Sequence, residues 1–449
     1  MRQAQSVSTS RALGDSTSRA PDGRGVMGRG TDSGTAPPEE GVYVPNEPTP
    51  SSYRSRQKLP RHRRRAFPVR AALAVRARYR RLTPRRRRLL ALILLAAVLL
   101  SAVISGLIYL RPPPKRLVVA SVPYWNLNYG TATVLANPRT FSEMSPWMYG
   151  LDSSGQIVPQ YPPAQAAAVE AQLARLRAEH VPLVPTIANV VGGNWVYAPT
   201  ITNILYSPTV RARHIAAIVA LVQREHYAGI DIDYEDLRAS DKGAFTAFIT
   251  QLADALHAQG KVLSVDLFAK TDHQGYAQRN LAQDYHAIGQ VADQVRLMGY
   301  DYHWATSAPG PVAPIGWIRA VLRYAKTEIP ASKIILGVPL YGYDWVGNHG
   351  TPVSWLQVFR LAGQYRIRPY FNYASQSPWF TYTDAAGRQH VVWFENAPST
   401  EAKFKAAQSA GIGGVYLWVY GYEDTSIWNA LRRSLPHRLP AASVWQPGM

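Results

Sequence analysis

The chain of 449 residues contains no cysteine, and its long C-terminal part carries almost no excess of basic over acidic residues. Without cysteine no disulfide can form, so a domain of about 320 residues must be stabilised by its buried core, which its size permits. Residues 1–116 hold 24 of the 49 Lys and Arg residues but only 6 of the 29 Asp and Glu residues, which leaves 25 and 23 in residues 117–449. The near-neutral balance of the larger part argues against a nucleic-acid enzyme, whose working domain would be basic.

Charge is also absent between Leu89 and Leu110, a run of 22 mostly apolar residues. As a helix this run would be about 33 Å long, enough to cross a hydrocarbon core of about 30 Å. Basic residues are much denser before the run than after it. We therefore expect an uncleaved transmembrane signal anchor with the N-terminus in the cytoplasm and the rest exported. A cleavable signal peptide fits less well, because the preceding basic region is long and no Ala-x-Ala site follows.

The segments on either side of this run differ in composition. Residues 1–84 are rich in Ser, Thr, Pro, Gly and Arg and have few large aliphatic residues, so we expect a disordered cytoplasmic tail. Residues 117–435 alternate short β-rich runs with longer stretches of helical spacing, and 436–449 form a short C-terminal tail.

The alternation in 117–435 predicts a (β/α)8 TIM barrel. The expected strands are 117–123, 147–151, 183–188, 229–235, 262–268, 294–300, 334–340 and 414–419, and the clearest helices are 163–179, 208–225, 242–259, 317–327 and 401–410. Residues 342–398 are too long for a simple crossover and are rich in aromatic residues. They predict a small α+β insertion between strands seven and eight. This insertion would form one wall of a groove, in which its aromatic side chains could pack against sugar rings.

The most informative motif is Gly229-Ile-Asp-Ile-Asp-Tyr-Glu-Asp-Leu237. Side chains two apart on a strand share a face, so Asp231, Asp233 and Glu235 are expected to stand in one row. Crowded, buried carboxyls repel one another, and this raises the pKa of one of them until it holds a proton near neutral pH, as acid catalysis requires. A solvated strand is the simpler alternative. A calcium loop is a weaker one, because an EF-hand loop requires Gly at its sixth position and Glu at its twelfth, and counting from Asp231 these positions hold Asp236 and Lys242.

The barrel pattern and its motifs resemble glycoside hydrolase family 18, the chitinase-like barrels, and most closely the bacterial spore-cortex lytic and germination N-acetylglucosaminidases. The family signature Asp-x-x-Asp-x-Asp-x-Glu is similar to Ala228–Glu235, and Met-x-Tyr-Asp on strand six is similar to Met298–Asp301. The phrases Ala269–Thr271, Pro309–Pro314 and Gly337–Trp345 resemble the same branch. Ala228 stands where the family usually has its first Asp. This difference is expected to shift the pKa of Asp231 or Asp233, while the catalytic Glu is intact.

The resemblance implies a retaining, substrate-assisted mechanism without a cofactor or metal. Glu235 would protonate the glycosidic oxygen, while the acetamido oxygen of the substrate attacks the anomeric carbon. Asp233 would hydrogen-bond the acetamido N–H and share a proton with Asp231. Tyr300 would orient the acetamido carbonyl.

The same resemblance implies a set of sugar-binding residues. Asp301 would hold the sugar near the cleavage point and Trp418 would form the floor beneath it, with Tyr124 and Trp345 as further substrate-binding candidates.

Five other charged residues are candidates for supporting roles. Asp266 points into the barrel and is expected to make a structural hydrogen bond. Asp344 and Glu395 either touch substrate or are structural, and both readings stay open. Arg296 and Lys270 are expected to be charge partners of the acidic row or of nearby loops.

These observations predict a membrane-anchored, extracytoplasmic hydrolase of β-linked N-acetylglucosamine glycans, either peptidoglycan or chitin-like. A catalytically silent, lectin-like cell-wall protein on the same fold is the alternative, and an endoglycosidase acting on glycoproteins is a third possibility. Loop shape decides between exo and endo action.

Overall fold

The computed structural model describes residues 83–86, 88–89, 92–93, 95–99, 116–138, 140–419 and 421–435. The described residues from 116 onward belong to one large compact unit, and those between 83 and 99 belong to a separate, smaller one. The predicted tails and most of the predicted span 89–110 lie outside the described residues. The described residues between 84 and 99 are helical. Among all described residues, no helix is both long enough and apolar enough to cross a bilayer.

The larger unit contains a closed barrel of eight parallel strands. Neighbouring strands follow the order β1-β16-β10-β9-β8-β7-β4-β2, and β1 pairs with β2 to close the ring. The strands are β1 (Leu117–Pro123), β2 (Glu143–Leu151), β4 (Thr186–Ala188), β7 (Gly229–Asp233), β8 (Val262–Phe268), β9 (Gln294–Met298), β10 (Ile334–Pro339) and β16 (Gly414–Trp418). The eight-stranded barrel predicted from the sequence is confirmed.

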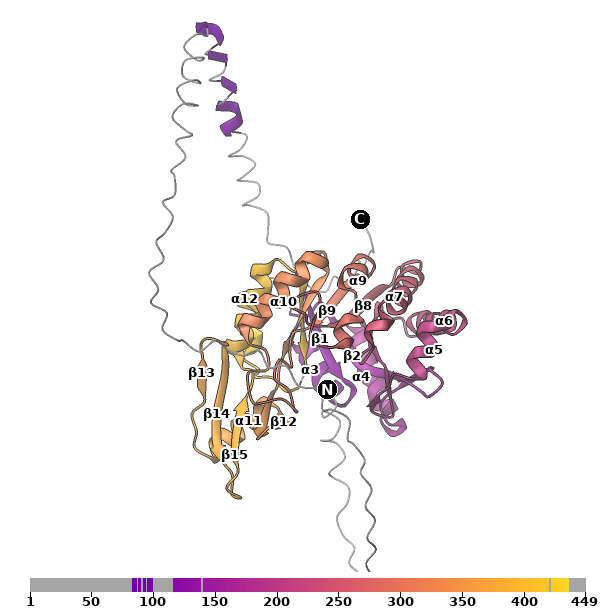
Figure 1. Cartoon of the computed structure of the whole chain (residues 1–449), viewed down its shortest axis with the longest axis vertical. Helices are drawn as coiled ribbons and strands as arrows, with labels where there is room; N and C mark the ends of the chain where they lie inside the picture. The colour runs from indigo at the N-terminus through magenta and orange to yellow at the C-terminus, as the bar shows by residue number, and fades with distance from the viewer. Residues whose placement is uncertain are drawn as a thin grey trace, which may run out of the picture. The chain divides into compact units, whose positions relative to one another are not determined.

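Helices follow the strands and lie outside the barrel (Figure 1). They are α3 (Leu127–Ala136), α4 (Ala166–Ala178), α5 (Thr200–Tyr206), α6 (Pro208–Arg224), α7 (Lys242–His257), α8 (Gln278–Leu281), α9 (Tyr285–Val291), α10 (Ile315–Glu328), α12 (Ala397–Ala410) and α13 (Ile427–Ser434), with single 3-10 turns at Tyr124–Asn126, Pro163–Gln165, Ala239–Asp241 and Ala331–Lys333. Local sequence explains their limits. For example, the Ser207 side chain caps α6 by accepting from the Val210 N–H, and Pro208 occupies the first turn.

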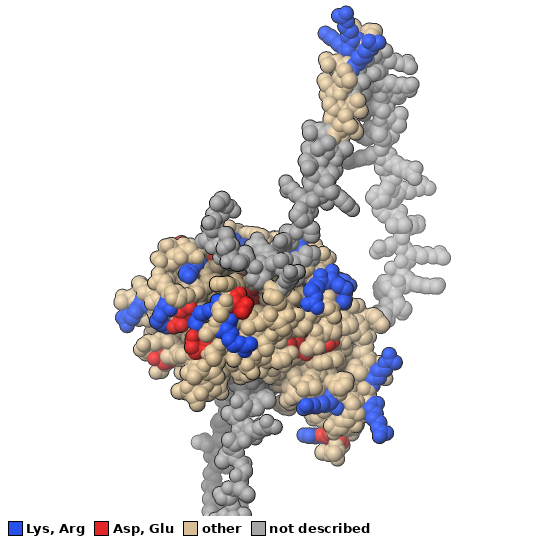
Figure 2. All heavy atoms as spheres, turned by 180° about the vertical axis from the view of Figure 1, so that it is seen from behind, with Lys and Arg blue, Asp and Glu red and all other residues tan. Residues whose placement is uncertain are grey.

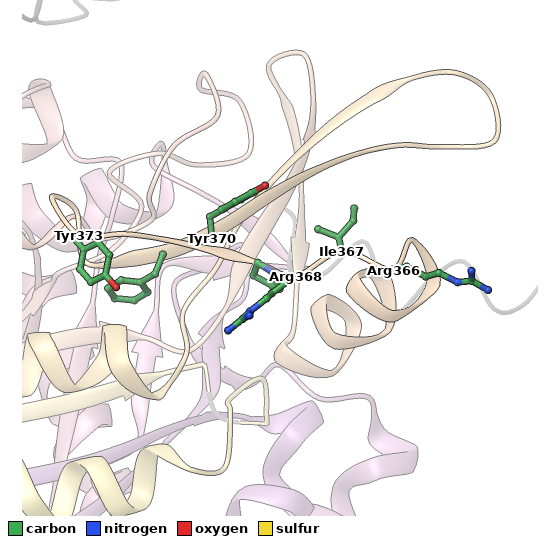
Figure 3. Close-up of a pocket in the computed structure, with 7 residues that line it drawn as sticks. Arg366, Ile367, Arg368, Tyr370 and Tyr373 are labelled. Carbon is green, nitrogen blue, oxygen red and sulfur yellow. The ribbon is translucent and has the colours of Figure 1, made fainter.

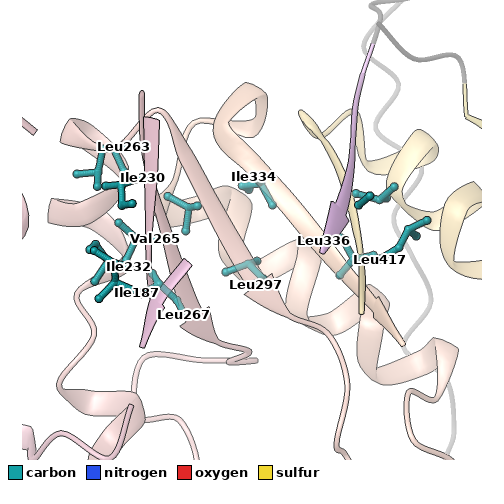
Figure 4. Packing of buried hydrophobic residues seen from close by; sticks show 14 of the residues in the cluster. Ile187, Ile230, Ile232, Leu263, Val265, Leu267, Leu297, Ile334, Leu336 and Leu417 are labelled. Atoms are coloured by element: carbon teal, nitrogen blue, oxygen red, sulfur yellow. The ribbon is translucent and has the colours of Figure 1, made fainter. Parts of the chain in front are cut away.

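The alternation of side chains along each strand separates two cores. Residues that point outward pack against the helices, as Ile230, Ile232, Val265, Leu297 and Leu336 do in Figure 4. Residues that point inward fill the barrel. Its upper part, near the carboxyl ends of the strands, is aromatic and includes Trp147, Tyr300, Tyr416 and Trp418.

The inward positions below these aromatic residues are polar, although TIM barrels are usually filled with branched aliphatic side chains. They include Glu143, Ser145, Thr186, Asp231, Ser264, Asp266, Gln294 and Arg296, all of them buried. The barrel interior therefore carries charges that need partners.

The predicted insertion between strands seven and eight is a five-stranded antiparallel sheet with one helix. Its strands are β11 (Gly342–Val346), β12 (His349–Val353), β13 (Tyr370–Asn372), β14 (Ser377–Thr383) and β15 (Gln389–Trp393), and its helix is α11 (Trp355–Gln364). The insert lies to one side of the barrel (Figure 1) and has its own small core around Phe380, Val392 and Phe394. Short strands β3 (Ile157–Pro159), β5 (Val190–Val191) and β6 (Asn194–Trp195) form additional pairings near the barrel.

Strand ends differ from the prediction by a few residues. β7 ends at Asp233 and β9 ends at Met298, two residues before the expected ends, so Glu235, Tyr300 and Asp301 stand on the loops that follow. On the face seen in Figure 2, Lys and Arg side chains are interspersed with Asp and Glu. This mixture agrees with the near-neutral composition of residues 117–449.

Candidate active site

The three carboxyls of the motif are all buried at the carboxyl end of the barrel. Asp231 and Asp233 point inward from β7, with 0% and 1% of their surface exposed, and Glu235 is 5% exposed just beyond the strand. Asp236 follows with a φ of 55°, a left-handed conformation that turns the chain away from the strand direction. The motif therefore forms a buried acidic row. Because its three carboxyls are buried, the solvated-strand alternative does not apply.

Asn189, at the end of β4, holds the backbone of Glu235 from both sides. Its Oδ1 accepts from the Glu235 N–H at 2.8 Å, and its Nδ2 donates to the Glu235 carbonyl at 2.8 Å. The same amide donates to the Val196 carbonyl at 2.7 Å. This side chain fixes the position from which the Glu235 carboxyl projects.

Asp231 is held by a cation and a hydroxyl inside the barrel. Arg296 Nη1 lies 3.1 Å from Asp231 Oδ2, and the Thr186 hydroxyl donates to the same oxygen at 2.8 Å. Arg296 Nη2 also pairs with Glu143 Oε1 at 2.9 Å, so one guanidinium serves two buried carboxylates. Burial opposes the charge of Arg296, but the charges of Asp231 and Glu143 outweigh it and raise the pKa of Arg296. The predicted role of Arg296 as partner of the acidic row is confirmed.

Asp233 shares the space between Asp231 and Glu235. Burial, reinforced by the charges of Glu235 and Asp231, raises the pKa of Asp233 well above its ordinary value. The indole Nε1 of Trp147 donates to Asp233 Oδ2 at 3.2 Å and opposes this rise. The carboxyl of Asp233 therefore tends to hold a proton.

Glu235 has the pKa that a general acid needs. Burial raises its pKa to about 7, Asp236 and Asp301 add to the rise, and the positive charge of Arg279 opposes it. Arg279 lies over the ring of Phe268, with its Cζ 4.3 Å from the ring centroid. A carboxyl with this pKa can deliver a proton near neutral pH and later accept one.

Tyr300 stands above the row on the loop after β9. Its hydroxyl lies 2.9 Å from that of Tyr416, which points inward from β16. Gly337 on β10 makes room for this ring, because a Cβ at that position would lie 2.7 Å from Tyr416 Cζ. Burial raises the pKa of Tyr300 well above its ordinary value, so its hydroxyl stays a hydrogen-bond donor.

Asp301 and Trp418 flank Tyr300. The carboxyl of Asp301, at a φ of 57°, accepts from the hydroxyls of Tyr341 at 2.5 Å and Tyr343 at 3.1 Å. Trp418 is the last residue of β16 and packs in the aromatic cluster with 7% of its surface exposed. Both lie at the mouth of the barrel together with the row.

The remaining candidates lie elsewhere or are engaged in structural contacts. Tyr124 follows β1 and is half-buried against Trp125 and Tyr161. The side chain of Trp345 is fully buried, and its Nε1 donates to the Trp304 carbonyl at 3.2 Å, so it offers no surface to a sugar in this conformation.

Asp344 and Glu395 both have partners within the protein. Asp344 binds His390 Nδ1 at 2.8 Å and the Tyr382 hydroxyl at 2.5 Å. Glu395 forms a buried pair with Lys403 at 2.7 Å. These contacts favour a structural role for the two carboxylates.

Lys270 donates to the carbonyls of Asn280 at 3.2 Å and Gln283 at 2.7 Å, and thereby organises the loop after β8. Its Nζ also lies 4.1 Å from the centroid of the Tyr285 ring. These contacts support the expected role in a neighbouring loop, rather than in the acidic row.

A large surface cavity lies away from this chemistry. It has a volume of about 800 Å³ and lies on the insert (Figure 3), lined by Arg366, Ile367, Arg368, Pro369, Tyr370, Phe371 and Tyr373. No carboxylate lines it. Across the described ranges, no group of three or more His, Cys, Asp or Glu side chains is arranged to hold a metal ion.

Comparison with known proteins identifies the family. Residues 149–423 match the sequence model of the glycosyl hydrolases family 18. The chain belongs to this family. The family 18 domain is 36% identical over 231 residues to the cortical fragment-lytic enzyme of Bacillus subtilis, a match that covers 50% of this chain and 54% of that enzyme. The chain thus spans only about half the length of that relative.

Solved structures of the same family superpose on this domain. The chitinase of Chromobacterium violaceum is 30% identical with a TM-score of 0.66, and the match covers 72% of this chain and all of that one. The spore cortex-lytic enzyme SleL of Bacillus megaterium is 27% identical with a TM-score of 0.65, covering 74% of this chain and 76% of that one. The predicted resemblance to the chitinase-like and spore-cortex lytic proteins is confirmed.

Four residues of the family 18 site had no signal in the sequence. Trp147, Thr186, Asn189 and Tyr416 contact the acidic row or Tyr300 from other strands. Trp147, Thr186 and Tyr416 lie on barrel strands and Asn189 directly follows β4, so an inward-facing position on or just after a barrel strand is the criterion that would have selected them.

Proposed function

We propose that the protein is a glycoside hydrolase that cleaves β-linked N-acetylglucosamine glycans, of the peptidoglycan or chitin type, by a retaining, substrate-assisted mechanism. The observation that carries the proposal is Glu235, a buried carboxyl whose pKa is raised to about 7 beside Asp233 at the carboxyl end of the barrel. The names of the relatives, a cortical fragment-lytic enzyme and a chitinase, support the same class of substrate.

In the proposed reaction Glu235 gives its proton to the glycosidic oxygen as the bond to the anomeric carbon breaks. The acetamido oxygen of the same sugar attacks that carbon and forms an oxazolinium ion. Asp233 accepts a hydrogen bond from the acetamido N–H, and the Tyr300 hydroxyl donates to the acetamido oxygen. Water then opens the ring while Glu235, now a carboxylate, takes a proton from it.

We further propose that the domain works outside the cytoplasm, held by a membrane anchor at residues 89–110. The support is the uncharged run of 22 residues with a dense cluster of arginines before it. Fractionation of cells with a tagged full chain, with protease added to intact spheroplasts, tests this directly. A tag recovered with soluble proteins, or a catalytic domain that stays protected from the protease, would contradict it.

The catalytic proposal is tested by mass spectrometry of the products released by the full chain. Substrates are purified peptidoglycan, N-acetylglucosamine oligomers and the same oligomers after deacetylation. We expect new reducing ends from at least one acetylated substrate and none from the deacetylated oligomers, which lack the internal nucleophile. Glu235→Gln should abolish release, while Glu179→Gln, an exposed Glu on the barrel surface, should not. If wild type and Glu235→Gln are equally inert but both bind glycan, the lectin-like alternative replaces this proposal.

A further inference from the structure

The insert carries a groove at the edge of its sheet, lined by arginine and tyrosine side chains. β13 is the last strand of this sheet and lies next to β14. The cavity of about 800 Å³ beside β13 is lined by Arg366, Arg368, Tyr370 and Tyr373, which come from one short segment (Figure 3). A second cavity, of about 460 Å³, shares Tyr373 with the first and is also lined by Arg319 of α10. We call the two cavities together the edge groove.

Cations in the edge groove outnumber the carboxylates that could neutralise them. Arg319, Arg366 and Arg368 are exposed, and none of the three forms an ion pair with another described residue. Glu401 is the one carboxylate that lines the groove within the described residues, and it is paired with Lys405 at 2.9 Å. Three guanidinium groups are therefore available to an anionic ligand. Each presents paired N–H donors, which match the two oxygens of a carboxylate.

Two features of this segment do not stabilise the fold. Tyr365 is the C-cap of α11, and Arg366 follows it with a φ of 53°. Glycine is the usual residue in this left-handed position after a helix, because a side chain is strained there. Tyr370 and Tyr373 have 66% and 80% of their surface exposed, although large aromatic rings usually bury much of their area in a core or an interface. Neither feature improves the packing of the insert, so both favour a role in binding.

A row of aromatic side chains connects the edge groove with the candidate active site. Tyr370 is paired with Trp379 of β14, and their ring centroids are 5.7 Å apart. Trp379 is paired with Trp393 of β15 and stacks on it at 5.5 Å. Trp393 is paired with Tyr343 of β11, whose hydroxyl donates to Asp301. Because paired residues project from one face of a sheet and strands lie about 4.8 Å apart, the row spans about 14 Å and one extended ligand can contact both of its ends.

We propose that the edge groove binds carboxylates of a glycan strand whose sugar rings lie along this aromatic row and enter the active site at Asp301. The arginines donate to the carboxylates, and the rings of Tyr370 and Tyr373 pack against apolar faces of the strand. Peptidoglycan carries carboxylates on its peptides, whereas a chitin-like strand is uncharged, so the groove selects peptidoglycan. The identity of the strand rests on the proposed function, but the binding of carboxylates does not. An anionic lipid surface would also satisfy the arginines, yet it would leave the row that ends at Asp301 without a role.

The test measures cosedimentation of the full chain with insoluble peptidoglycan, both native and after conversion of its carboxyls to amides. All proteins carry Glu235→Gln, so that the ligand is not consumed. The quantity compared is the ratio of the affinity for native peptidoglycan to the affinity for amidated peptidoglycan. The basic residues before the barrel contribute equally to this ratio in every protein, so a difference between proteins reports on the substituted positions.

The groove variant, Arg366→Gln combined with Arg368→Gln, should lower this ratio about tenfold, the combined effect expected of two exposed charge pairs. Arg213→Gln combined with Arg323→Gln is the matched control, because both arginines are exposed on barrel helices outside the groove, and it should leave the ratio unchanged. Tyr370→Ala should weaken binding to both forms of peptidoglycan about threefold, because the loss of an aromatic contact does not depend on the charge of the ligand.

An equal ratio in the groove variant and the control would overturn the inference, even if wild type hydrolyses peptidoglycan. The inference also fails if the groove variant loses as much affinity for vesicles of phosphatidylglycerol and phosphatidylcholine as for native peptidoglycan, because the groove would then bind a lipid surface. If the ratio changes as expected but wild type releases no reducing ends from any glycan, the proposed function fails and the edge groove remains a carboxylate-binding site.

Discussion

Removal of the Asn189 side-chain amide should disturb the position of Glu235 while leaving its carboxyl group in place. In Asn189→Ala, the N–H and the carbonyl of Glu235 both lose partners that lie 2.8 Å away in a buried site. A buried polar group left unsatisfied costs about 1–3 kcal/mol, so we expect a loss of roughly 3 kcal/mol in the free energy of unfolding. For a domain of about 320 residues that corresponds to a decrease in Tm of about 4–5 °C.

The effect on catalysis should exceed the effect on stability. Glu235 would still be present, but misplacement of a reacting group by about 1 Å lowers the rate by about 10²-fold. The assay is kcat/KM on N-acetylglucosamine oligomers at a temperature well below the Tm of the variant, with Asn203→Ala, an exposed Asn on α5, as control. If Asn189→Ala loses the expected stability but keeps kcat/KM within about threefold of wild type, Asn189 does not position the acid and the reasoning is refuted.

Two further predictions concern charges at different depths. In Arg279→Gln the positive charge that opposes the rise in the pKa of Glu235 is lost. Because Glu235 must be protonated to act as the acid, the basic limb of the pH–rate profile should move to higher pH, by less than about one unit for a partly exposed cation. Arg323→Gln on α10 is the control and should leave this limb in place. In Lys403→Met the buried Glu395, paired at 2.7 Å, loses its cation, which should cost about 3–5 kcal/mol in denaturant unfolding and more as pH rises, since burial already raises the pKa of Glu395. The pair of exposed Lys405 with partly buried Glu401 supplies the matched control, and Lys405→Met should cost less than about 1 kcal/mol. Equal losses in the two variants would contradict the role assigned to burial.

The strand pattern and the acidic motif were readable from the sequence because both depend on local spacing. The strands 117–123 and 262–268 were predicted with their observed limits, since each is a β-rich run bounded by turns. The Asp-x-Asp-x-Glu motif likewise gave the acidic row, although Glu235 lies beyond the strand end rather than on it.

The support around the row was not readable, because it is assembled from distant parts of the chain. Asn189 and Glu235 are 46 residues apart, and Trp147 and Asp233 are 86 apart. Only the closed barrel brings such pairs together, and no local pattern marks a single Asn or Trp as a partner. Trp345 illustrates the converse limit, because aromatic density in the insert suggested sugar contact while its indole is fully buried.

The way in which Asp301 is held has a consequence for engineering this protein. Its carboxylate accepts from Tyr341, two residues after the end of the barrel strand β10, and from Tyr343, which belongs to the first strand of the insert. The insert thus contributes a hydrogen-bond donor to the candidate active site. A chimera that exchanges residues 342–398 for a relative's loop to alter substrate range would therefore need to carry an equivalent phenol, or Asp301 would lose one of its two anchors.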